Sequence, residues 1–388
     1  MKQNLIPILM PKWGLTMEEG QVNEWLVKEG EEISVGDEII EVETDKITGA
    51  VEAVDAGVLR RCIAENENIY PVKSLLGVLA DAAVLDADIE TFIQAYEIPY
   101  SGEEDAEGSG PQYLYTEVDG LRVRYADRGS GDSVVLLLHG FGRDLDNWLF
   151  NLDALADKHR VLALDLPGHG ESGKTISEPS ISGLAKFVGK FLEVVGVPSA
   201  HIVGHSMGGA IAMQMVTECP ESVKSLGLIC SSGLGPEINS DYLQGFVDAQ
   251  SRRELKPVLQ QLFADESLVN RQLVDDVLKY KRLDGVDDVL RTLSSMLLSA
   301  TQTILSDKVV ASGKPTLVIW GEQDSIIPVA HARNFSASGG SSVEVEIFDA
   351  AGHMVQMEKS NDVNRRLLNF FSLSLIHIGR RRRDFSFS

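Results

Sequence analysis

The chain has 388 residues, of which 44% are hydrophobic and 24% charged, a composition typical of globular proteins and not of disordered chains. Its formal net charge of -23 argues against nucleic acid or an anionic membrane as a partner. Three cysteines without metal-ligand or CxxC spacing predict neither a disulfide framework nor a metal site, and they indicate a reducing compartment. Because the sequence lacks a secretory signal pattern and any apolar run of the ~18 residues that span a bilayer, we expect a cytoplasmic location.

The first part of the chain predicts a small all-β domain. Apolar stretches of strand length, such as residues 4–10 and 38–43, alternate with glycine-containing turns. We therefore expect a flattened barrel or a sandwich over residues 1–82. This region is acidic, since residues 1–99 contain seven Lys and Arg against twenty Asp and Glu, a net charge of -13.

A change in composition separates this domain from the rest of the chain. Residues 86–96 have apolar positions at helical spacing, and residues 99–112 are rich in Gly, Ser, Pro and acidic side chains. Residues 83–112 are accordingly predicted to form a short helix followed by a flexible acidic linker.

One lysine of the first domain is placed for chemical modification. Asp45 and Lys46 fall between two strand-like segments, 38–43 and 50–54, which predicts a two-residue hairpin turn that presents the amine to solvent. Surface hairpins often carry a lysine that has no function, so this pair alone decides nothing.

The sequence around Lys46 resembles the lipoyl domain of 2-oxo acid dehydrogenase complexes over residues 7–80. The matching segments are Met-Pro-Lys-Trp-Gly-Leu-Thr-Met at 10–17, Gly-Asp at 36–37, Glu-Thr-Asp-Lys-Ile at 43–47 and Gly-Val-Leu at 57–59. A biotinyl domain would typically have Met-Lys-Met at the tip. The resemblance implies that Lys46 carries covalent lipoate, a swinging arm that holds an acyl group as a thioester.

Residues 113–371 have the pattern of an α/β fold. Continuous apolar runs are typical of parallel strands that are buried on both faces. Here they occupy residues 134–138, 160–164, 200–203, 223–229 and 316–320. Helical segments lie between them, which predicts a mostly parallel sheet covered by helices. Amphipathic helical sequence at about 237–310 interrupts the alternation and predicts an inserted cap.

A serine nucleophile is predicted in this domain. Residues 204–208 read Gly-His-Ser-Met-Gly and match the G-x-S-x-G elbow between a buried strand and a helix. Serine needs a base that a third group orients, and in the α/β-hydrolases the chain order is serine, acid, histidine. Asp324 and His353 follow the last two predicted strands, at the catalytic edge of the sheet. Ser206, Asp324 and His353 are therefore the predicted catalytic triad of an α/β-hydrolase fold.

The oxyanion hole is predicted from two backbone N–H groups. One belongs to Met207, after the nucleophile, and the other to Phe141, in the His-Gly-Phe-Gly segment that follows the strand at 134–138. The same segment could also be a tight loop without a catalytic part.

Rival residues have simpler interpretations. Glu322 and Asp349 are near alternatives to Asp324, while Asp165 is expected to brace the loop that follows it. The other histidines of this domain are interpreted as structural or surface residues: His139, His159, His169, His201, His205 and His331.

The end of the chain differs from the rest. Residues 372–388 contain a short apolar segment, four arginines and Asp-Phe-Ser-Phe-Ser, and residues 373–378 resemble the translation of a transposase-end sequencing adapter. We interpret this tail as adapter-derived, with no part in the fold. A basic tail that binds acidic partners is the alternative.

The order of the parts resembles the dihydrolipoamide acetyltransferase component of bacterial acetoin dehydrogenase complexes, over residues 3–371. The resemblance implies that a thiamine-diphosphate-dependent acetoin dehydrogenase component acetylates the arm, and that this chain passes the acetyl group to coenzyme A. A dihydrolipoamide dehydrogenase would then reoxidise the arm, and a lipoate ligase or transferase would modify Lys46. Residues 81–112 are too short for a separate peripheral-subunit-binding domain, and no His-x-x-x-Asp-Gly segment is present, so transfer would depend on Ser206.

Two alternatives stay open from the sequence. The chain could be a serine hydrolase or thioesterase of acyl-lipoyl thioesters, small esters or diketones, since no basic pocket for the coenzyme A phosphates is evident. It could also be a lipoyl carrier whose second domain is a scaffold, although the complete triad argues against that.

Overall fold

The computed structural model describes residues 5–11, 17, 19–44, 48–81, 83–96, 113–299, 304–338 and 340–384. For residues 338, 341 and 373–384 it describes the backbone only. The chain divides into two compact units, one composed mainly of residues before 113 and one composed mainly of residues from 113 onward. The predicted linker at 99–112 lies outside the described residues.

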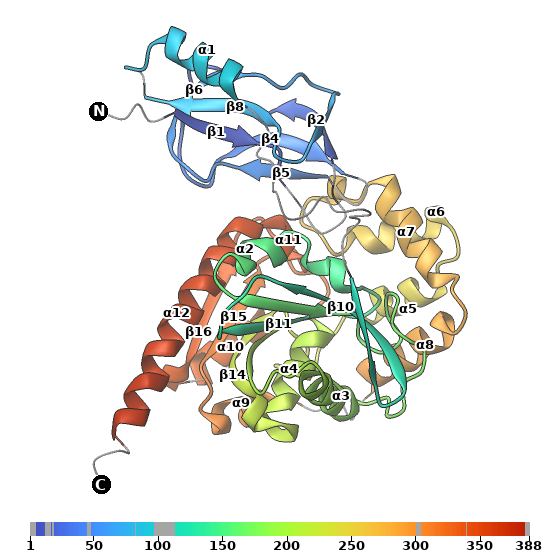
Figure 1. Ribbon diagram of the computed structural model, residues 1–388. Helices are drawn as coiled ribbons and strands as arrows, with labels where there is room; N and C mark the ends of the chain where they lie inside the picture. The colour runs from blue at the N-terminus through green and yellow to red at the C-terminus, as the bar shows by residue number, and fades with distance from the viewer. Residues whose placement is uncertain are drawn as a thin grey trace. The chain divides into compact units, whose positions relative to one another are not determined.

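The first unit consists of two four-stranded antiparallel sheets with the strand orders β1-β8-β6-β3 and β5-β4-β2-β7 (Figure 1). Their strands are β1 (Leu5–Leu9), β2 (Glu19–Trp25), β3 (Glu32–Ile33), β4 (Glu38–Glu43), β5 (Thr48–Glu52), β6 (Gly57–Cys62), β7 (Ile69–Pro71) and β8 (Leu75–Ala80). Ile8 and Leu59 from one sheet and Val22 and Val42 from the other belong to a single buried core. The predicted small all-β domain is confirmed. The helix expected after it is α1 (Asp86–Ala95), which buries Ile89.

The predicted hairpin around Lys46 is described up to its turn. Strands β4 and β5 pair in antiparallel register up to Glu43 opposite Thr48, a register whose midpoint falls between residues 45 and 46. Asp45 and Lys46 themselves lie outside the described residues.

The second unit contains an eight-stranded sheet with the order β16-β15-β14-β13-β11-β12-β10-β9. Its strands are β9 (Leu114–Val118), β10 (Leu121–Arg128), β11 (Val134–Leu138), β12 (Arg160–Leu164), β13 (Ala200–His205), β14 (Val223–Ile229), β15 (Thr316–Gly321) and β16 (Val343–Phe348). Strands β11 to β16 pair in parallel, whereas β9 and β10 are antiparallel. Every residue of β11, β13 and β15 is buried, as continuous apolar runs require.

Helices cover both faces of this sheet (Figure 1). On one face α4 (Met207–Glu218) contacts α3 (Ile181–Val194) and α9 (Ser306–Ser312), and on the other α2 (Leu152–Ala156) contacts α12 (Ser360–Asp384). Ser180 caps α3, because its side chain accepts a hydrogen bond from the Gly183 N–H. The remaining helices of the sheet domain are α10 (Ala330–Ser338), α11 (Val355–Glu358) and the short 3-10 helices η1 (Leu145–Trp148), η2 (Pro220–Ser222) and η4 (Gly340–Ser342).

The insertion between β14 and β15 is helical, as predicted. It contains α5 (Ser240–Asp248), α6 (Arg252–Gln260), η3 (Glu266–Leu268), α7 (Arg271–Lys281) and α8 (Val286–Leu297). Because α9 packs on α4 of the sheet domain, we place the end of the cap before Ser306 and not at 310.

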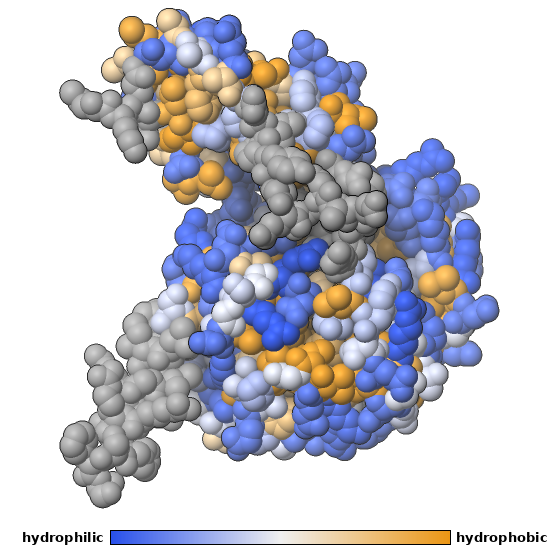
Figure 2. Space-filling view, viewed as in Figure 1, coloured by the Kyte–Doolittle hydropathy of each residue, from blue (hydrophilic) through white to orange (hydrophobic). Residues whose placement is uncertain are grey.

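The surface of the second unit is mostly polar on the face that Figure 2 shows, where hydrophilic residues surround small apolar groups. Within the described part of the chain, no helix combines the length and the apolarity that crossing a membrane demands.

Candidate active site

Ser206 lies at a sharp turn between β13 and α4. Its backbone has φ 54° and ψ -118°, a conformation that costs a residue with a side chain ~1–3 kcal/mol. Hydrogen bonds hold this strained turn, because the Ser206 N–H donates to the Ile229 carbonyl at 3.0 Å and the Ser206 carbonyl accepts from the Gly209 and Ser232 N–H groups. The surrounding structure therefore fixes Ser206 in the position that the elbow motif predicts.

The two glycines of the elbow allow backbone segments to approach closely. A Cβ on Gly204 would lie 2.2 Å from the Gly208 carbonyl oxygen, and one on Gly208 would lie 2.2 Å from the Leu138 carbonyl oxygen. Both contacts are far shorter than any real Cβ contact, so a side chain at either position must displace α4 or β11.

Gly208→Ala is therefore expected to lower the free energy of unfolding of this domain by ~3 kcal/mol or more, because the obstacle is backbone that cannot move aside. Urea denaturation followed by circular dichroism measures the change. Gly245→Ala in α5 is the matched control, since its methyl would meet only the side-chain methyls of Val258, at 3.1 and 3.8 Å. Equal losses in the two variants would contradict this account of the elbow.

Asp324 and His353 form a buried pair. The His353 Nδ1 lies 2.9 Å from Asp324 Oδ2, and both side chains are shielded from solvent. The other carboxylate oxygen, Oδ1, accepts the N–H groups of Ile326 and Ile327 at 2.8 and 2.9 Å. Since Nδ1 must carry the proton that faces the carboxylate, the opposite ring nitrogen, Nε2, is left to act as a base.

A small cavity contacts Ser206, His353, Phe141 and Met207 together. Its volume is about 20 Å³, which is room for about one water molecule. Met207 is the first residue of α4, so no carbonyl of its own helix can accept its N–H. Hydrophobic side chains from the cap and from the loop after β15 line the cavity: Ile238, Tyr242, Leu243, Leu262, Leu297, Ile326 and Ile327.

Three buried histidines around the site bind backbone groups. His205 Nε2 lies 2.9 Å from the His353 carbonyl, and therefore supports the loop that carries the base. His139 accepts the Leu166 N–H at Nε2 and approaches the Gly140 carbonyl with Nδ1. His169 accepts the Gly142 N–H and approaches the Pro167 carbonyl in the same manner. These rings are structural, as expected, and the role of His205 at the base loop was not foreseen.

Burial keeps these imidazoles neutral. It lowers the pKa of His139 and His205 well below the ordinary value and that of His169 to about 4. In His139 and His169 both ring nitrogens have hydrogen-bond partners, and one of them accepts a backbone N–H. A second proton on the ring would therefore place a ring N–H directly opposite that backbone N–H.

The free energy of unfolding should therefore fall as the pH drops below the ordinary histidine pKa of ~6.5, because these histidines bind protons in the unfolded chain but not in the folded one. Each such histidine contributes ~1.4 kcal/mol per pH unit down to its folded pKa. We expect urea titrations at pH 7, 6 and 5 to show this loss, and a shallower slope for His169→Gln. An identical slope in the variant would show that His169 is protonated in the folded protein.

Two of the rival acids, Glu322 and Asp165, have other partners. Glu322 pairs with Arg333 at the surface. Asp165 is buried and binds Arg124 as well as the N–H groups of Leu145 and Glu171, so it braces the loops beside the site as predicted. His159, His201 and His331 pair with Ser133, Ser225 and Glu237, respectively.

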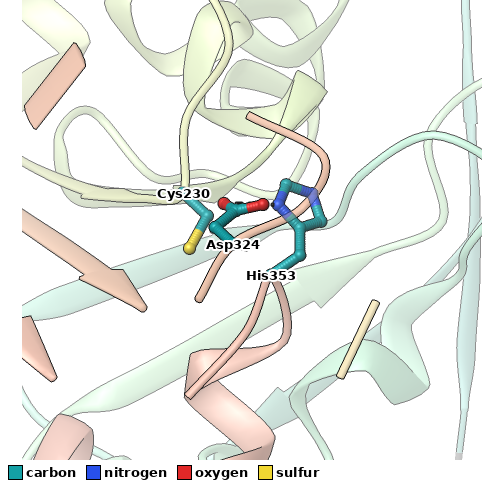
Figure 3. Close-up of side chains that lie close together, drawn as sticks. All are labelled: Cys230, Asp324 and His353. Carbon is teal, nitrogen blue, oxygen red and sulfur yellow. Dashed lines mark hydrogen bonds and ion pairs between the residues drawn. The ribbon is translucent and has the colours of Figure 1, made fainter. Parts of the chain in front are cut away.

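Cys230 is a site residue that the sequence did not reveal. It follows β14, the strand between those that precede Ser206 and Asp324, and Figure 3 shows the Asp324 carboxylate between its thiol and the His353 ring. The potential ligand atoms of these three residues all lie within 4.8 Å of one another. Burial raises the pKa of Cys230 well above its ordinary value, so the thiol stays protonated and is a poor metal ligand. No motif marks this cysteine, because its place depends on the pairing of distant strands.

Fold and site together define a class: a serine-elbow domain of the α/β-hydrolase fold, joined to a biotin/lipoyl-type domain. A family model described as alpha/beta hydrolase fold matches residues 133–360, and one described as Biotin-requiring enzyme matches residues 6–78. The dihydrolipoyllysine-residue acetyltransferase component of the acetoin cleaving system of Cupriavidus necator is 53% identical over 367 residues, covering 94% of this chain and 96% of its own length. The component of the same name from Pseudomonas putida is 45% identical, with 94% and 97% covered. This chain belongs to the family of dihydrolipoyllysine-residue acetyltransferase components of acetoin cleaving systems.

Solved structures resemble the second unit. A bacterial membrane phospholipase A matches with a TM-score of 0.59 and 26% identity, covering 68% of this chain and 86% of that one. A meta-cleavage product hydrolase from Pseudomonas fluorescens matches with a TM-score of 0.61 and 23% identity, covering 67% and 98%, which shows the shared fold alone.

Proposed function

We propose that this protein is the acyl-carrying and acetyl-transferring component of an acetoin-cleaving system. It would receive an acetyl group on a lipoyl arm at Lys46 and pass it through Ser206 to coenzyme A. The observation that carries the proposal is the joint presence of a lipoyl-type domain and an acyl-transfer site in one chain that is 53% identical, over nearly its whole length, to a component of that name.

The first domain suits covalent lipoate. Lipoate attaches by an amide bond to a lysine amine, and the pairing of Glu43 with Thr48 supports a hairpin turn centred on residues 45 and 46. When bound, the lipoyl group supplies a thiol that carries acetyl as a thioester.

Lys46 is expected to gain the mass of one lipoyl group when the protein is incubated with lipoate, ATP and a lipoate ligase. Mass spectrometry of the peptide that contains Lys46 measures this. Lys46→Arg keeps the charge but has no primary amine and should stay unmodified, whereas Lys28→Arg, at an exposed position of the same domain, is the control and should be modified normally. Modification of Lys46→Arg would place the arm elsewhere.

Acetyl transfer would proceed in two steps. His353, held by Asp324, takes the proton of Ser206 as Oγ attacks the thioester carbonyl. The N–H groups of Phe141 and Met207 stabilise the negative oxygen, and one such donor is commonly worth ~3 kcal/mol of barrier. The leaving thiolate takes the proton from His353, which leaves acetyl-Ser206. The acceptor thiol then gives its proton to His353 and attacks acetyl-Ser206. As the new thioester leaves, His353 returns this proton to the serine oxygen, which restores free Ser206 and a neutral His353.

The narrow cavity at Ser206 supports transfer over hydrolysis. Its volume of about 20 Å³ is smaller than a thioester substrate, so we expect the cap to move aside for substrates and to cover acetyl-Ser206 afterwards. Closure limits the water that could hydrolyse this intermediate.

The second candidate function is a thioesterase or small-ester hydrolase. It is favoured by curated relatives of the second domain that are named hydrolases, such as one from Paraburkholderia phymatum that is 30% identical over 264 residues. Incubating the protein with S-acetyl dihydrolipoamide and coenzyme A, and measuring acetyl-CoA against acetate, separates the two functions. Acetyl-CoA as the main product is expected, and acetate alone would refute the transfer function.

The proposed partners follow from this route. They are a thiamine-diphosphate-dependent acetoin dehydrogenase component that loads the arm, a dihydrolipoamide dehydrogenase that reoxidises it, and a lipoate ligase or transferase that modifies Lys46. Co-purification from cells grown on acetoin tests the first two.

A further inference from the structure

A second cavity, of about 550 Å³, lies beside the active site and is much larger than it. It is open to solvent between the start of α3, one face of α4, the end of α8 and the start of α9. Its wall mixes hydroxyl, amide and amine groups with apolar side chains. The lining residues are Pro179, Ser180, Ile181, Ser182, Ala210, Gln214, Gly233, Thr292, Ser295, Met296, Leu297, Ser299, Leu305 and Lys308.

This cavity adjoins the space around Ser206. Leu297 lines both. Met207 lines the small cavity and Ala210, one helical turn further along α4, lines the large one. Leu297, at the end of α8, is therefore a side chain that the two spaces share.

The distances suit a long thiol-bearing arm. From Ser206 to Gln214 the chain follows α4 for eight residues, which is ~12 Å at 1.5 Å per residue. Lys308 Nζ donates to the Gln214 side-chain oxygen at 3.2 Å and so marks the far end of this path. The pantetheine arm of coenzyme A has about twelve bonds between its sulfur and its first phosphate oxygen, as many as about four residues of extended chain, or ~14 Å.

The chemistry of the far end suits an anionic group. Lys308 lies there, and the N-terminus of α3, a helix of 14 residues, contributes its positive end. Two carboxylates lie at the same end. Glu218 accepts hydrogen bonds from Ser182 and Gln214, and Glu178 pairs with Lys186 and accepts a hydrogen bond from Ser180. Neither carboxylate is among the residues that line the cavity, whereas Lys308 and the start of α3 are.

We propose that this cavity binds the acceptor, a thiol on a long amide-containing arm that ends in phosphate groups, and that Leu297 separates the acceptor from Ser206 until the arm enters. This inference rests on the proposed acetyl transfer to coenzyme A. The thiol would reach acetyl-Ser206 along α4, while the phosphates stay at Lys308 and the start of α3.

The first test fills the cavity. Ser295 is exposed on α8 and lines the cavity, so Ser295→Trp can occupy it without disturbing the core. In the Ser206→Ala background, calorimetric titration with coenzyme A should show at least tenfold weaker binding for Ser295→Trp. Ser336→Trp, a change of the same kind at an exposed helical position of α10 outside the cavity, is the control and should bind as the parent does. Equal binding by both tryptophan variants would overturn the proposal.

The second test separates the arm from its phosphates. In active protein, Lys308→Gln should raise the KM for coenzyme A about tenfold more than the KM for pantetheine, which has no phosphate. Ser295→Trp should abolish the advantage of both acceptors over N-acetylcysteamine, a short thiol that does not reach the cavity. If wild-type protein makes acetyl-CoA but neither variant changes these ratios, the cavity is not the acceptor site. If wild-type protein acetylates no thiol at all, the proposed function itself has failed.

Discussion

Ser206→Ala is expected to lower the rate of acetyl transfer from S-acetyl dihydrolipoamide to coenzyme A by ~10⁴-fold or more. The reason is that the two-step route needs an acyl-serine, and a histidine without its nucleophile contributes little. Stopped assays of acetyl-CoA formation measure the loss. Acid quenching followed by mass spectrometry of the intact wild-type protein should show acetyl-Ser206, which must be missing from the variant. Transfer by Ser206→Ala at the wild-type rate would rule out a covalent intermediate.

The backbone at this position provides a control for folding. With φ 54° and ψ -118°, Ser206 has a conformation that glycine adopts at little cost. Ser206→Gly should therefore be inactive but more stable than Ser206→Ala by ~1 kcal/mol in urea denaturation. If Ser206→Gly is inactive and yet more stable than Ser206→Ala, its loss of activity cannot result from unfolding.

Asp324→Asn is expected to lower kcat/KM by ~10⁴-fold, the size of effect known when an amide replaces the acid of a serine triad. The amide cannot hold the proton on His353 Nδ1 as the carboxylate does at 2.9 Å, so Nε2 no longer acts as the base. Steady-state kinetics measure the effect, and near-ultraviolet circular dichroism verifies the fold. If Glu322→Gln or Asp349→Asn had the larger effect, Asp324 would not be the acid.

The position of Cys230 allows the loss of activity in Asp324→Asn to be tested by rescue. Because its side chain approaches the Asp324 and His353 side chains from the neighbouring strand, an aspartate at 230 would present a carboxylate to the same imidazole (Figure 3). Combining Cys230→Asp with Asp324→Asn should restore ~10-fold or more of the lost activity. Cys230→Ser with Asp324→Asn, which adds no charge, is the control and should restore none.

Local sequence patterns predicted much of the second domain. Val134–Leu138 forms β11 with the predicted bounds, since a run of apolar residues that is buried on both faces has few other structures available. The order serine, acid, histidine along the chain was enough to predict the hydrogen bond between His353 and Asp324. Phe141 and Met207 were expected at the same place, and both line the cavity at Ser206.

Long-range contacts were not predictable in the same manner. The contact of Cys230 with Asp324 and the support that His205 gives to the His353 loop arise only when distant strands pair in a particular register. The large cavity is also a product of tertiary packing, because helices far apart in the chain form its wall.

The position of each domain along the chain also determines which domain can fold first during synthesis. The core of the lipoyl-type domain is complete within residues 8–89, so it can fold as soon as it leaves the ribosome. Ser206, in contrast, waits for Asp324 and His353, which are synthesised about 120 and about 150 residues later and reach their places only when β16 pairs with β15. At ~5–20 residues per second, the lysine is available to its ligase roughly 10–60 s before the serine can react. A newly made chain can therefore receive its arm before it possesses an active site that would act on the arm's cargo.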